Sequence, residues 1–123
     1  MVPNSRIEGF LQAIIDESEA PYEPEFRTEY FLDDILEGRT STMVPVYSLE
    51  KFLAKISGAD VEVPEPRSRA EQYLAAIIYG GNVDIPATPS SRLERYLEQL
   101  MYKMLNYSVA IVGEARVNFC LAG

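Results

Sequence analysis

The pattern of apolar and polar positions along the chain repeats five times. Each copy reads Pro-x-x-Arg-x-Glu-x-aromatic-Leu-x-x-Ile, with serine in place of arginine in the third copy and leucine as the last residue of the fifth. The copies open at Pro3, Pro24, Pro45, Pro66 and Pro89, which are 21, 21, 21 and 23 residues apart. Five near-identical units at a nearly constant period indicate a repeat protein, in which each unit packs on its neighbours.

Within each copy the apolar residues follow the period of an amphipathic helix. In the first copy, Ile7, Phe10 and Ile14 recur at spacings of three and four residues, which places them on one helix face. Three copies carry a serine three residues before the glutamate, the spacing of a capping box that starts a helix: Ser5, Ser68 and Ser91. The pattern predicts five short helices, near residues 5–18, 26–37, 47–57, 68–80 and 91–105.

The aromatic position of the repeat is the strongest candidate for a core residue. Leucine follows it in every copy. Single helices shorter than about 12–15 residues are marginal in water, so the five apolar stripes must pack together. We expect the five rings to be largely buried: Phe10, Phe31, Phe52, Tyr73 and Tyr96. A row of rings that binds a ligand is the alternative interpretation.

The pattern changes after the fifth helix. Residues 108–112 and 116–121 flank Gly113, are rich in apolar and β-branched residues, and in the second stretch alternate apolar with polar positions. This arrangement favours a β-hairpin. The fold class we predict is therefore mainly α, with five short-helix repeats of about 21 residues over 1–105 and a small C-terminal hairpin over 106–123. A lone hairpin is barely stable, so we expect it to pack on the helices or to pair with another chain.

The charge of the chain is concentrated in its first third. Residues 1–38 hold ten acidic and two basic residues, which accounts for the whole net charge of −8. Such a field repels nucleic acid and attracts basic protein surfaces. We therefore predict that Asp33, Asp34 and Glu37 face a basic protein partner and that the chain does not bind nucleic acid directly. A solvated face that serves only solubility is the alternative.

Four repeats place an arginine in the first turn of their helix: Arg6, Arg27, Arg69 and Arg92. The helix dipole disfavours a cation at this position, so each arginine needs a compensating interaction. One interpretation is that the arginines join successive units through carbonyl or carboxylate oxygens. Another is that each guanidinium stacks on the aromatic ring four residues later. The functional interpretation is that the arginines bind a phosphate or carboxylate of a partner.

The residue inventory argues against catalysis. The chain has no histidine and one cysteine, Cys120, which excludes His-based catalysis, a Cys/His zinc site and an intrachain disulfide. Nucleotide-binding and hydrolase motifs are missing from the sequence. We therefore expect no enzyme activity, no cofactor and no metal. The N-terminus lacks the features of a signal peptide, and no run of about 18 apolar residues occurs, so we expect neither this route of secretion nor a membrane partner.

The repeat unit resembles a short repeat of phage and prophage proteins from Gram-positive bacteria. Residues 66–74 and 89–97 match it most closely, and the third unit departs from it at Ser48. Its bearers include head-fibre, tail-fibre and baseplate proteins and small uncharacterised phage proteins. The resemblance implies a non-enzymatic structural or attachment module, in the virion or the host cytoplasm, that forms homo-oligomers or docks on other virion subunits. The alternative is an acidic phage-encoded inhibitor that mimics nucleic acid and binds a basic host defence nuclease.

Overall fold

The computed structural model describes residues 2–80 and 83–112, and within these residues the chain forms five helices. They are α1 (Arg6–Asp16), α2 (Arg27–Glu37), α3 (Ser48–Ile56), α4 (Arg69–Tyr79) and α5 (Arg92–Val112). The first four lie inside the predicted ranges, with ends that differ by at most two residues. The prediction of a mainly helical chain with one helix per repeat is therefore confirmed.

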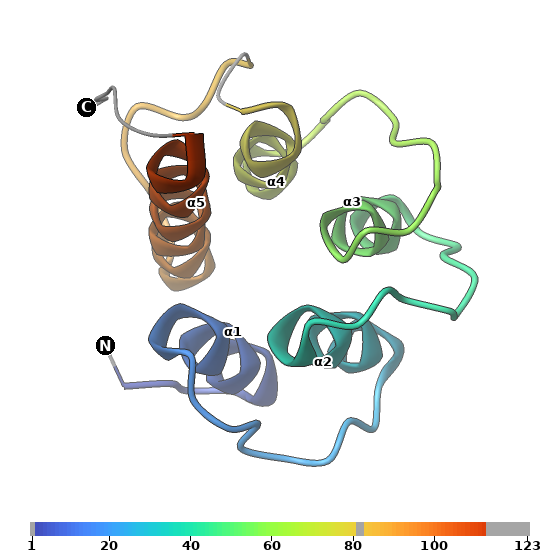
Figure 1. Cartoon of the computed structure of the whole chain (residues 1–123). Coiled ribbons are helices and arrows are strands. Elements are labelled where there is room, and N and C mark those ends of the chain that lie inside the picture. The colour runs from blue at the N-terminus through green and yellow to red at the C-terminus, as the bar shows by residue number, and fades with distance from the viewer. Residues whose placement is uncertain (1, 81–82, 113–123) are drawn as a thin grey trace.

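The five helices stand side by side in a closed ring (Figure 1). Each helix packs on the next one along the chain, and α5 packs on α1. The linkers pass round the outside of the ring and return the chain to the end at which the next helix begins (Figure 1). The repeats therefore close on themselves instead of continuing as an open stack.

The helix ends follow the capping rules that the sequence obeys locally. The hydroxyl oxygen of Ser5 accepts a hydrogen bond from the backbone N–H of Glu8 at 3.3 Å, and Ser68 makes the equivalent bond at the start of α4. α2 and α4 end at Gly38 and Gly80, whose φ angles of 74° and 72° are left-handed. Glycine adopts this conformation without a steric penalty, so each of these helices ends at its glycine.

The core lies inside the ring and is built from the aromatic–leucine pairs of the repeat. All five aromatic residues have an exposed fraction of 0%: Phe10, Phe31, Phe52, Tyr73 and Tyr96. The leucines that follow them are buried as well, at 4% exposure or less. The prediction that these rings form the core is confirmed. Because each large side chain contributes about 1.5–3 kcal/mol on burial, this shared centre is what holds five otherwise marginal helices together.

The prediction of a C-terminal hairpin is wrong where the structure describes it. α5 continues to Val112, so residues 108–112, expected as the first strand, are helical, and the described residues contain no strand. The second expected strand, 116–121, lies outside the described residues. Leu105, Val109 and Val112 continue the helical spacing of the preceding turns, and extending an existing helix costs far less than nucleating a new element. The helical period therefore prevails over the strand preference of β-branched residues.

Candidate functional site

The first-turn glutamate is a buried hydrogen-bond acceptor in four of the five repeats. Glu29 and Glu50 are only 1% and 3% exposed. Their Oε1 atoms accept hydrogen bonds from the backbone N–H groups of Glu25 and Val46, at 2.9 and 2.8 Å. In a capping box this bond goes to the N-cap residue itself, whereas here the shortest bond goes to the residue before it. Each glutamate thus holds the end of the incoming linker.

The same carboxylates bind the arginine of the preceding repeat. Arg6 donates from Nε and Nη2 to the two carboxylate oxygens of Glu29, at 2.8 and 2.9 Å, and from Nη2 to the backbone carbonyl of Glu23 at 2.7 Å. Arg27 makes the equivalent pair of bonds to Glu50, at 2.9 and 2.8 Å, and a third bond to the carbonyl 17 residues further on. In both cases this carbonyl belongs to the residue immediately before the next repeat proline.

These contacts, which we call arginine clamps, explain three residues of the repeat motif. The arginine supplies a planar fork of donors and the glutamate supplies a matching pair of acceptors. The proline restricts the preceding residue to an extended backbone, which presents that residue's carbonyl to the arginine. Each clamp therefore joins the first turn of one helix to the linker and the first turn of the next.

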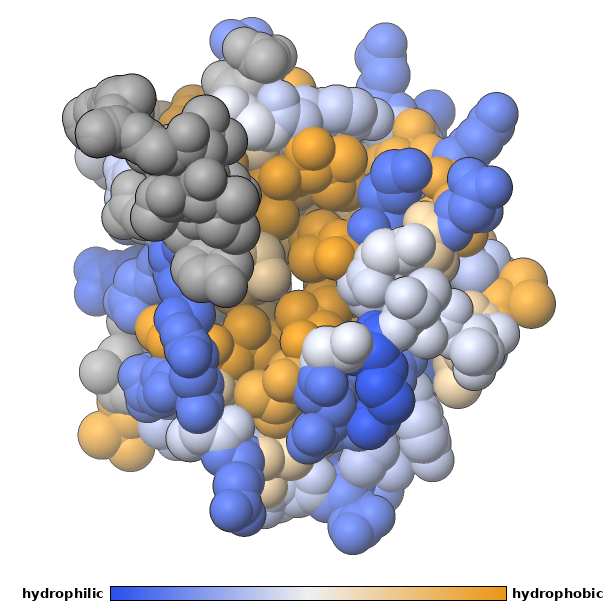
Figure 2. All heavy atoms as spheres, in the orientation of Figure 1, coloured by the Kyte–Doolittle hydropathy of each residue, from blue (hydrophilic) through white to orange (hydrophobic). Residues whose placement is uncertain are grey.

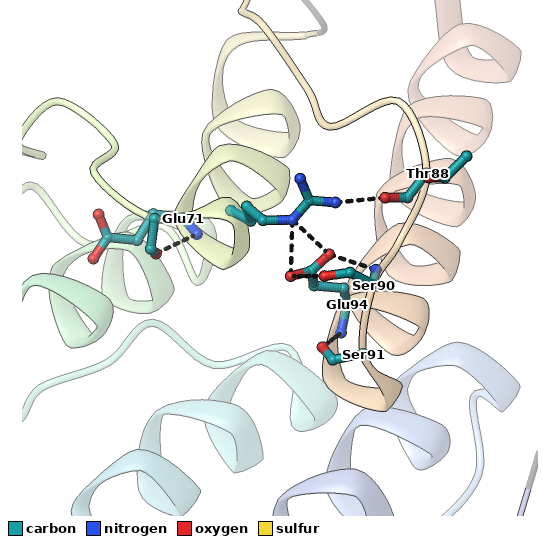
Figure 3. A network of polar contacts seen from close by, with 7 residues as sticks. Glu71, Thr88, Ser90, Ser91 and Glu94 are labelled. Carbon is teal, nitrogen blue, oxygen red and sulfur yellow. Dashed lines mark hydrogen bonds and ion pairs between the residues drawn. The ribbon is translucent and has the colours of Figure 1, made fainter.

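Figure 3 shows the clamp between α4 and α5. The Nε of Arg69 donates to both carboxylate oxygens of Glu94, at 3.0 and 3.1 Å, and Nη2 donates to the carbonyl of Thr88 at 2.5 Å. The backbone N–H of Ser90 donates to Glu94 at 2.9 Å, and the hydroxyl of Ser91 accepts the backbone N–H of Glu94 at 3.2 Å. Pro66 and Pro89 stand 23 residues apart, whereas the other neighbouring repeat prolines stand 21 apart. At this junction the Nε of Arg69 alone donates to both carboxylate oxygens.

The last arginine closes the ring onto the first repeat. Arg92 donates to the two carboxylate oxygens of Glu8, at 3.2 and 2.8 Å, and to the carbonyl of Val2 at 2.6 Å. These partners lie 84 and 90 residues away in the sequence. They nevertheless occupy the same repeat positions as in the other clamps, the first-turn glutamate and the residue before the proline. The five units therefore form one cycle.

One junction of the cycle lacks its clamp. The third repeat has Ser48 where the others have arginine. The glutamate of the next unit, Glu71, accepts the backbone N–H of Arg67 at 2.9 Å, and no guanidinium of the described residues binds it. α3 and α4 are thus joined by packing and by the linker, without the ionic contact found at the other four junctions.

The clamps shift the pKa values of their carboxyl groups. Hydrogen bonds from Arg27, supported by the backbone N–H groups of Val46 and Tyr47, lower the pKa of Glu50 to about 2 although burial opposes this change. Hydrogen bonds from the clamp arginines likewise lower the pKa of Glu29 and that of Glu8. These carboxylates are therefore ionised at neutral pH, as a charge-assisted bond requires.

The four predicted arginine positions are thus engaged within the chain. Their bonds match the interpretation that arginines join successive units, through both a carboxylate and a carbonyl. The stacking interpretation fails for Arg6, which lies over the ring of Tyr22, 4.5 Å from its centroid, and not over that of Phe10. Binding of a partner's phosphate or carboxylate would have to compete with the hydrogen bonds already made by Nε and Nη2.

The predicted acidic contact residues lie in the last two turns of α2. Arg39 donates from Nη2 to Asp33 at 2.7 Å and from Nε to Asp34 at 3.3 Å. Glu37 is exposed and has no ion-pair partner among the described residues. Arg39 therefore offsets one of the three negative charges of these residues, which we call the acidic turn, and Glu37 is the carboxylate among them without an ion-pair partner in the described residues.

A hollow of about 690 Å³ opens at the end of the ring where the helices finish. Every helix contributes to its lining, and Figure 2 shows apolar side chains around its centre with hydrophilic side chains outside them. Its main apolar residues are Ile14, Ile35, Ile56, Ile77 and Met104. Four of these occupy the last apolar position of the repeat motif. The sequence analysis missed this central hollow, although the recurring isoleucine was visible, because only ring closure brings the five positions together.

Charged residues at the central hollow are unevenly placed. Lys103 on α5 pairs with Glu17 after α1, with Nζ 2.5 Å from Oε2. Lys55, on the last turn of α3, is exposed and has no ion-pair partner among the described residues. On the α2 side, the lining residues Ile35 and Leu36 directly adjoin the acidic turn described above. The predicted acidic contact residues therefore lie at the same end of the ring as the hollow, although none of the three belongs to its lining.

The described part of the chain contains no group of three acidic or cysteine side chains placed to hold a metal ion. Across the same residues, no helix combines the length and the apolar character that crossing a membrane requires. Comparison with known proteins gives no matching family model, no similar curated protein and no similar solved structure.

Proposed function

We propose that this chain is a non-enzymatic assembly module of the kind found in phage virions, acting through protein–protein contacts. The observation that carries the proposal is the central hollow, a depression with an apolar centre and a polar rim that all five helices share on one face of a closed ring. The resemblance of the repeat unit to repeats of head-fibre, tail-fibre and baseplate proteins supports the virion as its setting.

Ring closure limits which surfaces can bind a partner. In open repeat proteins the terminal units present the same packing surfaces as the internal ones, so further copies can stack on them. Here α5 packs on α1 and Arg92 clamps Glu8, so those packing surfaces are already occupied within the chain. Partner binding is therefore assigned to a face of the ring and not to its repeat ends.

The central hollow has the size and composition of a binding site. Its volume of about 690 Å³ lies within the range of about 300–1,000 Å³ typical of ligand pockets. Apolar surface that stays exposed and is surrounded by polar side chains commonly marks a protein interaction site. The packing of the five helices around the buried rings also favours binding, because it places the lining residues together before the partner arrives.

The acidic turn of α2 gives the same face an electrostatic role. Exposed carboxylates attract a basic partner over a distance of about one Debye length, about 10 Å at 0.1 M salt and about 3 Å at 1 M. Association steered in this way slows as salt rises, while dissociation changes less.

The experiment measures binding kinetics of the full chain to purified virion proteins and to a panel of basic host nucleases. The test variant neutralises the acidic turn by Asp33→Asn, Asp34→Asn and Glu37→Gln. The control removes the same charge from the α3–α4 linker by Asp60→Asn, Glu62→Gln and Glu65→Gln. We expect a virion protein to bind, with an association rate that falls with salt and falls more in the test variant than in the control. No binding to any virion protein would contradict the proposal.

The second candidate function is the acidic inhibitor of a host defence nuclease. The observation that favours it is the confinement of the whole net charge to residues 1–38, since a dense negative surface is what a nucleic-acid groove binds. Binding to a nuclease alone, at the expense of its nucleic-acid substrate, would assign the protein to this class.

A further inference from the structure

We propose that the central hollow binds the apolar face of a basic amphipathic helix supplied by the partner protein. The inference rests on the proposed function, because it names the part of the partner that the module recognises. Three features of the structure support it: the volume of the hollow, its apolar lining and the charges at its mouth.

The volume suits the side chains of a helix face. One turn of an α-helix, a cylinder about 10 Å wide and 5.4 Å long, fills roughly 420 Å³. A hollow of about 690 Å³ therefore accommodates the apolar side of about two turns while the opposite side remains outside. Partner helices of this kind place large apolar residues at positions i, i+3, i+4 and i+7 in such a groove.

The lining offers apolar contacts in all directions around the hollow. Isoleucines come from α1, α2, α3 and α4, and Met104 comes from α5. Methionine adapts its shape to different neighbours, which suits an interface that receives side chains of varied outline. The lining also contains Ser18, Glu17 and two lysines, and these polar groups suit the polar side of an amphipathic helix.

The charges at the mouth favour a basic occupant. α1 to α4 all contribute lining residues from their last turns or the cap that follows, and the C-terminal end of a helix carries a partial negative charge. The acidic turn of α2 adds to this field, and Glu17 neutralises Lys103. Lys55 is the one lining charge without an ion-pair partner among the described residues, and the four helix ends together with the acidic residues of α2 outweigh it, so the field favours a cationic partner.

The uneven placement of these charges also orients the helix. Its basic residues lie towards the end of α2, where Glu37, the residue after the lining Leu36, is exposed and has no ion-pair partner among the described residues. Towards α3 the mouth carries Lys55, which repels basic residues on that side. Changing this lysine to glutamate therefore removes the repulsion and adds an attraction, without touching a buried residue.

The test uses a labelled synthetic peptide of 18 residues with leucine and phenylalanine at i, i+3, i+4 and i+7 and lysine on its polar face. One control peptide has the same composition with the apolar positions scrambled, and another has glutamate in place of lysine. Fluorescence anisotropy with the full chain gives the affinities, and laurate serves as the anionic competitor. We expect the basic amphipathic peptide to bind at least tenfold more tightly than either control peptide, and laurate not to displace it.

Variants of the chain locate the site. Lys55→Glu should strengthen binding of the basic peptide at least threefold, whereas Lys51→Glu, the same change on α3 outside the lining, should have less than half of that effect. Ile56→Glu should weaken binding at least tenfold, whereas Ile85→Glu in the exposed α4–α5 linker should not. Circular dichroism and the denaturation midpoint establish that each variant is folded.

Several outcomes would overturn the inference. They are tighter binding of the acidic peptide, displacement by laurate, weaker binding in Lys55→Glu, or an unchanged affinity in folded Ile56→Glu. A virion protein that binds the chain but is not displaced by the peptide would refute this inference and leave the proposed function standing. Binding of the peptide without binding of any virion protein would refute the proposed function and leave this inference standing.

Discussion

The first-turn glutamate joins two neighbouring repeats at every clamp. In the second clamp, Glu50 accepts two bonds from Arg27 and two from the backbone of the incoming linker while nearly inaccessible to solvent. A buried carboxylate is tolerable only with such compensation. The repeat motif keeps this glutamate in all five units, including the one that lacks the arginine partner.

Replacing this carboxylate by its neutral isostere should destabilise the fold. Glu50→Gln retains an oxygen that can accept a backbone N–H but removes the charge that faces Arg27. We expect the free energy of unfolding to fall by about 1–3 kcal/mol, the range for hydrogen bonds to charged groups. Urea denaturation measures the change, and Glu62→Gln in an exposed linker is the control. A midpoint equal to that of the control would show that the clamp adds no stability.

The lowered pKa values predict how stability depends on pH. The pKa of Glu50 is about 2 in the folded chain and about 4.3 when unfolded. A lowered folded-state pKa stabilises the protein above the unfolded value, and this contribution is lost as the pH falls towards the folded value. The thermal midpoint should therefore drop between about pH 4.5 and pH 2, and drop less steeply in Glu50→Gln. Parallel pH curves for the two proteins would contradict this account.

The two tyrosines of the core carry hydroxyl groups that the fold does not use. Tyr73 and Tyr96 are fully buried, and their hydroxyl oxygens find no hydrogen-bond partner among the described residues. The first three repeats have phenylalanine at this position. Tyr73→Phe and Tyr96→Phe should leave the free energy of unfolding unchanged or raise it by up to about 1 kcal/mol. A loss of more than about 1 kcal/mol in chemical denaturation would reveal a partner for the hydroxyl.

At the scale of elements, α3 and α4 form the junction that departs from the repeat. At each of the other four junctions, the arginine of one helix binds the first-turn glutamate of the next repeat and the backbone carbonyl of the residue before that repeat's proline. Here Glu71 and the carbonyl of Glu65 stand in the same sequence relation to position 48, but Ser48 cannot reach them as an arginine would.

Restoring the missing arginine should strengthen this junction. Ser48→Arg places the planar fork at the position where four other helices carry it, and we expect a higher denaturation midpoint. Ser48→Lys is the control, because a lysine brings the charge without the two-pronged geometry and meets the same unfavourable helix dipole. If both variants are equally stable, the gain is general charge attraction and the clamp geometry is not its source.

The elements that sequence analysis predicted correctly are those set by local rules. Ser5 and Ser68 start helices, and the helical period places Phe10 and its counterparts inside. The hairpin failed because short β-branched stretches suit either element, and the preceding turns of α5 decided between them. The sequence analysis anticipated that the arginines bind carboxylate or carbonyl oxygens, but it did not identify the partner residues. Each carboxylate partner lies at least 23 residues away in the sequence, and the repeat pattern alone does not give the arrangement of neighbouring helices that brings the two residues together.

At the scale of the whole molecule, closure is the feature that no single repeat encodes. It depends on the rotation from each helix to the next, which over five units adds up to a complete turn (Figure 1). Closure buries the surfaces that an open stack would offer to further copies, and it gathers the last isoleucine of the first four repeats and Met104 of α5 around one hollow. That is why the candidate binding site was absent from the sequence-based expectations while the acidic residues beside it were present among them.

Ring closure is therefore the claim on which both the site and its proposed partner depend. The most direct test is a double-mutant cycle between Arg92 and Glu8, which lie 84 residues apart in the sequence. The cycle uses Arg92→Gln, Glu8→Gln and the double variant, with the Arg6–Glu29 pair of adjacent repeats measured in the same way for comparison. A closed ring predicts a coupling energy for the distant pair equal in sign and similar in size to that of the adjacent pair. A coupling energy of zero for Arg92 and Glu8, beside a clear coupling for Arg6 and Glu29, would mean an open stack and would contradict the account.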